Sequence, residues 1–335
     1  MTASRRSIRS IAINAVLTVL ALGLLAWTVW WNGPKLREVW SRSPDWRLFA
    51  AALLVYVCAL LVTFFRWYTL VKALGLPFRI QDAFRLGFIG NVFNLVIPGA
   101  VGGDVVKAAF LCREQEHKTQ AVASMVIDRA LGLLGLFALA GAIGAFEWGG
   151  GSPYLRRGIA FAWLMVVCGV IGLAVLFSPA LFRPLLARLN PAGKLAKGLS
   201  ELIALASVYR DRLGVIAAGL GLAMLGHALY VLAFYLANRG LFGSEAPGLA
   251  SHLVVVPLIL FSTAIPTPFG ALGVSEQISQ KLFAEILGFS GGAIAMLGFR
   301  VVMYAGGLVS VLVYLANLSQ VRSLREVDMP EREGG

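Results

Sequence analysis

The stretch that decides the fold is "NLVIPGAVGGDVVKAAF", residues 94–110, because it interrupts an apolar segment with helix-breaking residues and a charge. Pro98 removes a backbone hydrogen-bond donor, and the glycines that follow it weaken a helix. Asp104 then places a carboxylate in a segment that otherwise suits hydrocarbon. Backbone groups freed from a helix persist in a bilayer only where protein buries them or water reaches them. We therefore expect a broken, re-entrant helical hairpin at residues 86–112.

The composition indicates that the whole chain belongs in a membrane. Of the 335 residues, 59% are hydrophobic and 14% are charged, against about 25% charged residues in soluble domains. The net charge of +12 comes from Lys and Arg clusters between apolar runs, which is typical of cytoplasmic loops and argues against nucleic acid as a partner. The three cysteines and three histidines lack metal-ligand spacing, so we expect no metal and no other cofactor.

Six apolar runs approach or exceed the length of about 20 residues that a membrane-crossing helix needs. The first of them is too long for a signal peptide and has no cleavage site after it, so we interpret it as an anchor. A second interrupted stretch, residues 249–287, carries "IPTPFGALGVSE" and predicts a second hairpin. The six predicted spans are residues 11–31, 48–65, 121–146, 158–182, 213–238 and 293–318.

The basic residues orient these spans. A cytoplasmic N-terminus at residues 1–10 also places the basic loops 66–85 and 183–212 and the tail 321–335 in the cytoplasm, as the positive-inside rule requires. The basic loop at residues 35–47 is the exception. The two hairpins then open to opposite sides of a multi-pass protein of the bacterial-type cytoplasmic (inner) membrane.

The spacing of charges suggests an inverted repeat within residues 11–320. Arg129 lies 25 residues after Asp104, and Arg300 lies 24 residues after Glu276. Each half would contain a crossing helix, a Pro/Gly hairpin with an acid, and a helix with an arginine. Inverted repeats with discontinuous helices recur in transporters. The expected fold is all-α and integral to the membrane, with about six full transmembrane helices plus two oppositely oriented re-entrant hairpins.

Ionisable groups inside membrane spans are costly, about 2.5–3.5 kcal/mol or more for an arginine, and usually functional. The residues predicted to bind substrate are Asp104, Arg129, Glu276, Arg300, Asp128, Asn91, Asn94 and Arg66. The residues predicted to form the hairpin turns are Pro98, Gly102, Gly103, Pro266, Pro268, Gly270 and Gly273.

Most of these residues also have a purely structural interpretation. Asp104 can cap a helix, pair with a buried arginine, or bind a cationic headgroup or a proton, and Glu276 shares the capping alternative. Arg129 can form an ion pair with Asp128, Asp104 or Glu276. Arg66 directly follows its predicted span, a position that favours a side chain extending to the cytoplasmic interface. The two asparagines can satisfy backbone groups of the broken helix.

Three motifs in this order carry a family resemblance: "IPGAVGGDVVKA" (97–108), "VIDRALGL" (126–133) and "IPTPFGALGVSE" (265–276). Over about residues 10–320 the chain resembles the integral-membrane domain of lysylphosphatidylglycerol synthases of the multiple peptide resistance factor type. It also resembles standalone flippase-like relatives of that domain, some of which are linked to hopanoid or other lipid pathways. The resemblance implies movement of a lipid between leaflets by a transporter without the synthase domain. The family often has glutamate where this chain has Asp104, which leaves the substrate open.

We therefore expect a flippase or translocase for a lipid with a charged headgroup, phosphorylated or aminoacylated, working passively or coupled to an ion. Its expected partners are such lipids and lipid-biosynthesis enzymes. Two alternatives stay open. One is an intramembrane protease or lipid-modifying enzyme using Asp104 and Asp128, although "VGGD" lacks the GxGD order. The other is a scaffold for lipid synthesis that transports nothing.

Overall fold

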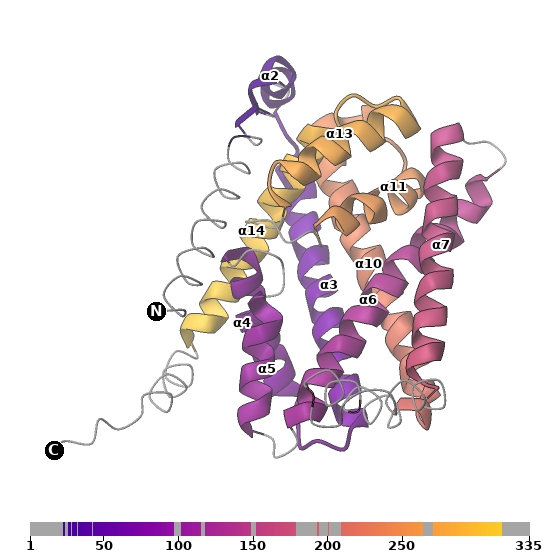
Figure 1. Cartoon of the computed structure of the whole chain (residues 1–335). Coiled ribbons are helices and arrows are strands. Elements are labelled where there is room, and N and C mark those ends of the chain that lie inside the picture. The colour runs from indigo at the N-terminus through magenta and orange to yellow at the C-terminus, as the bar shows by residue number, and fades with distance from the viewer. Residues whose placement is uncertain are drawn as a thin grey trace, which may run out of the picture.

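A computed structural model of the chain shows an all-α integral membrane protein (Figure 1). No strand occurs in the part of the chain that the structure describes. This part comprises residues 33–41, 43–96, 102–114, 118–148, 152–178, 209–263 and 271–316, with isolated positions at 23, 26, 27, 29–31, 193 and 200.

Five of the described helices are long and apolar enough to cross a membrane. The shortest has 24 residues and is therefore about 36 Å long, which exceeds the hydrocarbon thickness of about 30 Å. These five correspond to five of the six predicted spans, whereas the predicted span 11–31 lies almost entirely outside the described residues. The five are α3 (Trp46–Ala73), α6 (Lys118–Glu147), α7 (Pro153–Leu176), α10 (Leu213–Phe242) and α14 (Gly292–Ala316).

The long helices α3 and α10 form a central antiparallel pair. At one end, the backbone amide of Asp45, the N-cap residue of α3, donates to the carbonyl of Gly240 near the end of α10 over 2.9 Å. At the other end, the hydroxyl of Tyr209, just before α10, donates to the carbonyl of Leu70 over 3.0 Å. The two helices therefore run in opposite directions through the molecule.

Four shorter helices occupy the two segments where hairpins are predicted. Each has 13 to 17 residues and is about 20–26 Å long, too short to cross the hydrocarbon core alone. The first two pack against each other, as do the last two, while the turns at 97–101 and 264–270 lie outside the described residues. The four helices are α4 (Ile80–Val96), α5 (Gly102–Glu114), α11 (Leu249–Ser262) and α13 (Val274–Leu287).

The two short pairs lie at opposite ends of the molecule (Figure 1). The pair α11 and α13 shares its end with α2 (Gly33–Ser41), whereas α4 and α5 lie at the other end. The 3₁₀ turn η1 (Gly243–Glu245) directly follows α10. Along the chain, a long helix, two short helices and a long helix follow one another twice, as α3–α4–α5–α6 and as α10–α11–α13–α14. This order, with α3 and α10 antiparallel, is the one that an inverted repeat requires.

Small residues set the distance between helices at two places. A Cβ atom on Gly103 of α5 would lie 2.0 Å from the carbonyl oxygen of Gly90 on α4. A Cβ atom on Gly135 of α6 would lie 2.5 Å from the methyl group of Ala223 on α10. Close backbone approach through small residues is the usual way in which helices associate in lipid. These glycines therefore fix how α5 and α6 are placed around the site described next.

The outermost long helix, α7, presents a broad apolar surface. Its side chains Leu164, Val170 and Ile171 are 55%, 52% and 56% exposed. Such a surface suits contact with lipid tails, which are as apolar as leucine.

Candidate functional site

A cavity of about 300 Å³ lies among α3, α4, α5, α6, α10, α11 and α14. Both halves of the chain contribute to its wall. Aromatic and aliphatic side chains such as Phe64, Leu136 and Phe299 form much of the lining. Among the described residues, the charged side chains in the wall are Arg66, Asp104, Lys107, Asp128, Arg129 and Arg300.

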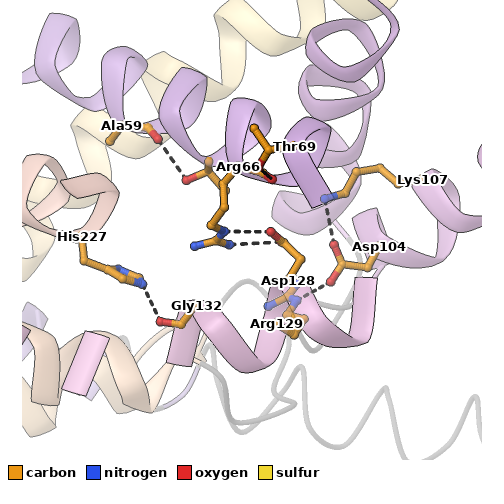
Figure 2. A network of polar contacts seen from close by, with 10 residues as sticks. Ala59, Arg66, Thr69, Asp104, Lys107, Asp128, Arg129, Gly132 and His227 are labelled. Carbon is orange, nitrogen blue, oxygen red and sulfur yellow. Dashed lines mark hydrogen bonds and ion pairs between the residues drawn. The ribbon is translucent and has the colours of Figure 1, made fainter. Parts of the chain in front are cut away.

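Arg66 and Asp128 form a buried, bidentate ion pair between α3 and α6. Nε of Arg66 donates to one carboxylate oxygen of Asp128 over 2.8 Å, and Nη2 donates to the other over 3.1 Å (Figure 2). Arg66 is 6% exposed, so the interpretation that its side chain extends to an interface is wrong. Because Asp128 neutralises the charge, Arg66 can be buried within α3, which continues to Ala73.

Asp104 pairs with two cations at once. Its carboxylate accepts from Nε of Arg129 on α6 and forms an ion pair with Nζ of Lys107, one turn further along α5, over 3.0 Å (Figure 2). The side chain of Arg129 is 48% exposed and that of Asp104 is 16% exposed. Of the three acids considered for Arg129, the structure places Asp104 against it, while Asp128 faces Arg66.

The capping interpretation of Asp104 is wrong, because α5 begins at Gly102 and Asp104 is its third residue. The side chain of Asn94 takes that role: its oxygen accepts from the backbone amide of Gly103 over 2.8 Å. Asn91 instead donates to the hydroxyl of Ser310 over 2.9 Å, which ties α4 to α14. Both asparagines also line the cavity.

Lys107 is a site residue that the sequence analysis missed. It is 8% exposed, and its ammonium group lies 5.1 Å from the centre of the Trp67 ring. A lysine three residues after Asp104 in "GGDVVK" is the available signal, since residues three apart on a helix face the same side. Because Lys107 lies so close to the interrupted segment, we did not predict it as a separate site residue.

In the second half, Arg300 and Glu276 repeat the arrangement of Arg129 and Asp104. Glu276 is the third residue of α13, and Nε of Arg300 on α14 donates to it. Nη2 of Arg300 also donates to the hydroxyl of Ser275 over 2.7 Å. Both partners are buried, with side chains 4% and 0% exposed. Arg300 lines the cavity, but Glu276 lies outside its wall, so the four predicted charges are not all at its surface.

The described residues of α10 that line the cavity are polar. His227 lines the cavity, and its Nε2 lies 3.0 Å from the carbonyl oxygen of Gly132 on α6. Tyr230, one turn further on, packs edge-on against Tyr56 of α3. No group of three or more metal-ligating side chains occurs among the described residues.

The structure describes three of the seven predicted turn residues. Gly102 opens α5, Gly103 makes the close approach to α4, and Gly273 precedes α13 with a φ of +81°. That left-handed backbone conformation favours glycine. The predicted turn residues outside the described part of the chain are Pro98, Pro266, Pro268 and Gly270.

One stretch has the spacing of a serine-nucleophile motif. "GFSGG", residues 288–292, fits the pattern G-x-S-x-G. In hydrolases that serine sits in a sharp turn between a strand and a helix, whereas Ser290 lies in the turn between helices α13 and α14. Its carbonyl accepts from the side chain of Gln280 over 3.1 Å. The match is therefore one of spacing alone.

Comparison with known proteins gives two findings. Residues 13–310 match the family described as the lysylphosphatidylglycerol synthase TM region. A UPF0104 membrane protein of Pyrococcus horikoshii is 25% identical over 122 residues, a stretch that covers 36% of this chain and 36% of that protein. No solved structure matches the chain.

Proposed function

The chain belongs to the family of lysylphosphatidylglycerol synthase TM regions, and from this premise we propose that it moves a lipid with a charged headgroup between membrane leaflets. The observation that carries the proposal is the charged cavity, which is walled by helices of both halves and holds a half-exposed arginine, Arg129. Around it the chain presents apolar helices. A headgroup could therefore enter the cavity while its acyl chains stay in lipid.

The paired short helices supply the geometry for such a path. In this proposal α4 with α5 and α11 with α13 are re-entrant hairpins that enter the bilayer from opposite sides, because none of the four is long enough to cross it. The basic ends of α3 and α4 lie on the cytoplasmic side of an inner membrane, as do both termini. Alternating opening of the cavity between the two halves is the general mode of transporters built from inverted repeats.

The geometry favours transport over intramembrane proteolysis. A carboxylate protease needs two acids that share a proton. Here Asp104 is held by Lys107 and Arg129, and Asp128 is held by Arg66. The acids therefore belong to separate ion pairs. We accordingly propose a transporter and not an enzyme, with charged-headgroup lipids as its partners.

Reconstitution tests this function. The full chain is placed in vesicles that carry fluorescent lipids, and a membrane-impermeant quencher reports which leaflet each lipid occupies over time. We expect transfer that exceeds the rate in protein-free vesicles. Thin-layer chromatography of the same lipids provides the control for chemistry. Modified lipid without transfer would favour the enzyme, and neither transfer nor modification would favour the scaffold.

A further inference from the structure

Arg66 has hydrogen-bonding capacity that its ion pair does not use. Its guanidinium group is almost completely buried, and Nε and Nη2 donate to the two carboxylate oxygens of Asp128. The third nitrogen, Nη1, points away from Asp128 and toward the side of His227 and Gly132 (Figure 2). Among the described residues, none accepts a hydrogen bond from Nη1. Because Arg66 lines the cavity, this nitrogen offers its N–H donors to a molecule that enters.

His227 offers the complementary group. Its Nε2 lies 3.0 Å from the carbonyl oxygen of Gly132, and a carbonyl can only accept, so Nε2 carries the hydrogen of the neutral ring. Nδ1 of the same ring is then an acceptor. It is buried, and no described residue donates a hydrogen bond to it. Because a buried acceptor without a donor costs free energy, a ligand that donates to Nδ1 would be stabilised there.

Both groups adjoin Gly132 of α6, which also lines the cavity. The carbonyl oxygen of Gly132 contacts the ring of His227, and a Cβ atom on this glycine would lie 3.6 Å from Nη1 of Arg66. Glycine therefore leaves the space beside the guanidinium group open. An unused donor and an unused acceptor thus lie next to the same residue of the cavity wall.

The pairing with Asp128 decides which kind of ligand atom suits Arg66. Both oxygens of that carboxylate face the guanidinium group, so the charge of Arg66 is balanced within the pair. The remaining donors therefore suit a neutral oxygen. An ester carbonyl can accept from Nη1 but has no hydrogen for Nδ1 of His227, whereas a hydroxyl group both accepts and donates. The two groups together favour a hydroxyl.

We infer that the cavity binds a lipid whose charged headgroup is a polyol, with one hydroxyl group accepting from Nη1 of Arg66 and donating to Nδ1 of His227. This inference rests on the proposed function and narrows its substrate class. Nδ1 is buried in this conformation, so the hydroxyl reaches it when the cavity opens to take up the lipid. A headgroup of the same charge without a hydroxyl would leave both groups unsatisfied, and sites built to bind a hydroxyl discriminate strongly against such analogues.

Binding by the purified full chain in detergent tests this inference. Isothermal titration calorimetry compares three probes: dioctanoyl phosphatidylglycerol, dioctanoyl phosphatidylethanol, which has the same charge but no headgroup hydroxyl, and soluble glycerol phosphate. We expect the first to bind at least about tenfold more tightly than each of the others, which corresponds to about 1.4 kcal/mol. Similar affinity for phosphatidylethanol would overturn the recognition of a hydroxyl. Similar affinity for glycerol phosphate would overturn a lipid as the source of the polyol.

Two substitutions test whether the hydroxyl binds at Arg66 and His227. His227→Phe keeps a planar ring without an acceptor, so it should reduce the preference for phosphatidylglycerol over phosphatidylethanol to about twofold or less. Gly132→Ala places a methyl group beside the guanidinium group, 3.3 Å from Nη2 and 3.6 Å from Nη1, and should also reduce the preference. Gly172→Ala is the matched control and should keep it, since nothing lies within 4 Å of a Cβ atom there. An undiminished preference in His227→Phe would overturn the inference.

The folded state of each variant is checked by thermal unfolding and size-exclusion chromatography. If His227→Phe does not fold, Gly132→Ala and the lipid preference of the unaltered chain still decide the inference. Selective binding of phosphatidylglycerol without leaflet transfer would contradict the proposed function and leave the inference standing. Leaflet transfer of both lipids with equal affinity for the two would do the reverse.

Discussion

Arg66 and Asp128 show how the fold tolerates a full charge inside an apolar helix. The carboxylate of Asp128 accepts two hydrogen bonds, at 2.8 and 3.1 Å, from a guanidinium that is almost completely buried. Removal of one partner of such a pair leaves the other charge uncompensated, which costs far more than removal of both.

Asp128→Asn should therefore destabilise the protein by about 3–5 kcal/mol, the range for breaking a buried ion pair. The midpoint of thermal unfolding in detergent measures the effect. Asp82→Asn is the matched control, since Asp82 pairs with Arg85 over 3.1 Å near the surface, where such pairs contribute about 0–1 kcal/mol. An equal loss in both variants would contradict this account of the pair.

The double variant Arg66→Met, Asp128→Leu should recover much of the stability lost in Asp128→Asn, because apolar residues of similar volume replace buried pairs at little cost. It removes one cation and one anion from the cavity wall and leaves the ion pairs of Asp104 in place. The same unfolding measurement checks it. A double variant that is less stable than Asp128→Asn would show that the helices need the charges themselves.

At the level of residues, the sequence indicated the important side chains more clearly than it indicated the pairs that they form. The spacing between Asp104 and Arg129, and between Glu276 and Arg300, corresponds to two ion pairs in the structure. The partner of Arg66 could not be inferred, because Asp128 lies 62 residues away and is adjacent in sequence to another arginine. Long-range pairing depends on how helices pack, which no local spacing contains.

The close contact between α4 and α5 depends on Gly103. A methyl group on that residue would overlap the carbonyl oxygen of Gly90, at 2.0 Å from it. Gly103→Ala should therefore force the two helices apart and cost about 1–3 kcal/mol, the usual range for overpacking. Thermal unfolding measures the change.

Gly172→Ala on α7 is the control for this substitution, since nothing lies within 4 Å of a Cβ atom at that position. It should be neutral or slightly stabilising, because alanine is the better helix former. If both variants lose the same stability, helix propensity and not the contact with Gly90 explains the effect.

The orientation of the short helices can be tested with single cysteines. In a chain whose natural cysteines Cys58, Cys112 and Cys168 are replaced by alanine, new cysteines are placed at exposed positions near the two ends of the molecule. We expect Gln81→Cys and Asp211→Cys to react with an impermeant maleimide from the cytoplasmic side, and Glu245→Cys and Glu285→Cys from the other side. Labelling of all four from one side would contradict the opposed hairpins.

At the level of elements, hydropathy predicted the positions of the long helices well. Charged residues near the helix ends made the predicted bounds less accurate. The predicted span 48–65 stops before Arg66, whereas α3 continues to Ala73 and buries that arginine against Asp128. The interruptions "IPGAVGGD" and "IPTPFGALGVSE" each separate two short helices. Prolines and glycines are local signals, so breaks in helices are easier to predict than the contacts between their two halves.

At the scale of the whole molecule, the account requires the headgroup to pass through the cavity. Met303→Trp on α14 adds bulk to the cavity wall without a change in charge, and it should slow leaflet transfer in the vesicle assay. Leu312→Trp on the same helix is the control, since Leu312 is 62% exposed on the apolar surface. Unchanged transfer in Met303→Trp would place the path elsewhere.

The most direct measurement of the central claim is the initial rate at which a lipid with a charged headgroup moves between leaflets in vesicles that contain Arg129→Gln or Arg156→Gln. Each variant loses one arginine, but Arg129 lines the cavity, whereas Arg156 is an exposed residue of α7 outside the cavity wall. The account predicts a rate at least about tenfold lower for Arg129→Gln, a change of about 1.4 kcal/mol in the barrier, and an unchanged rate for Arg156→Gln. Equal rates in the two variants, both well above that of protein-free vesicles, would contradict it.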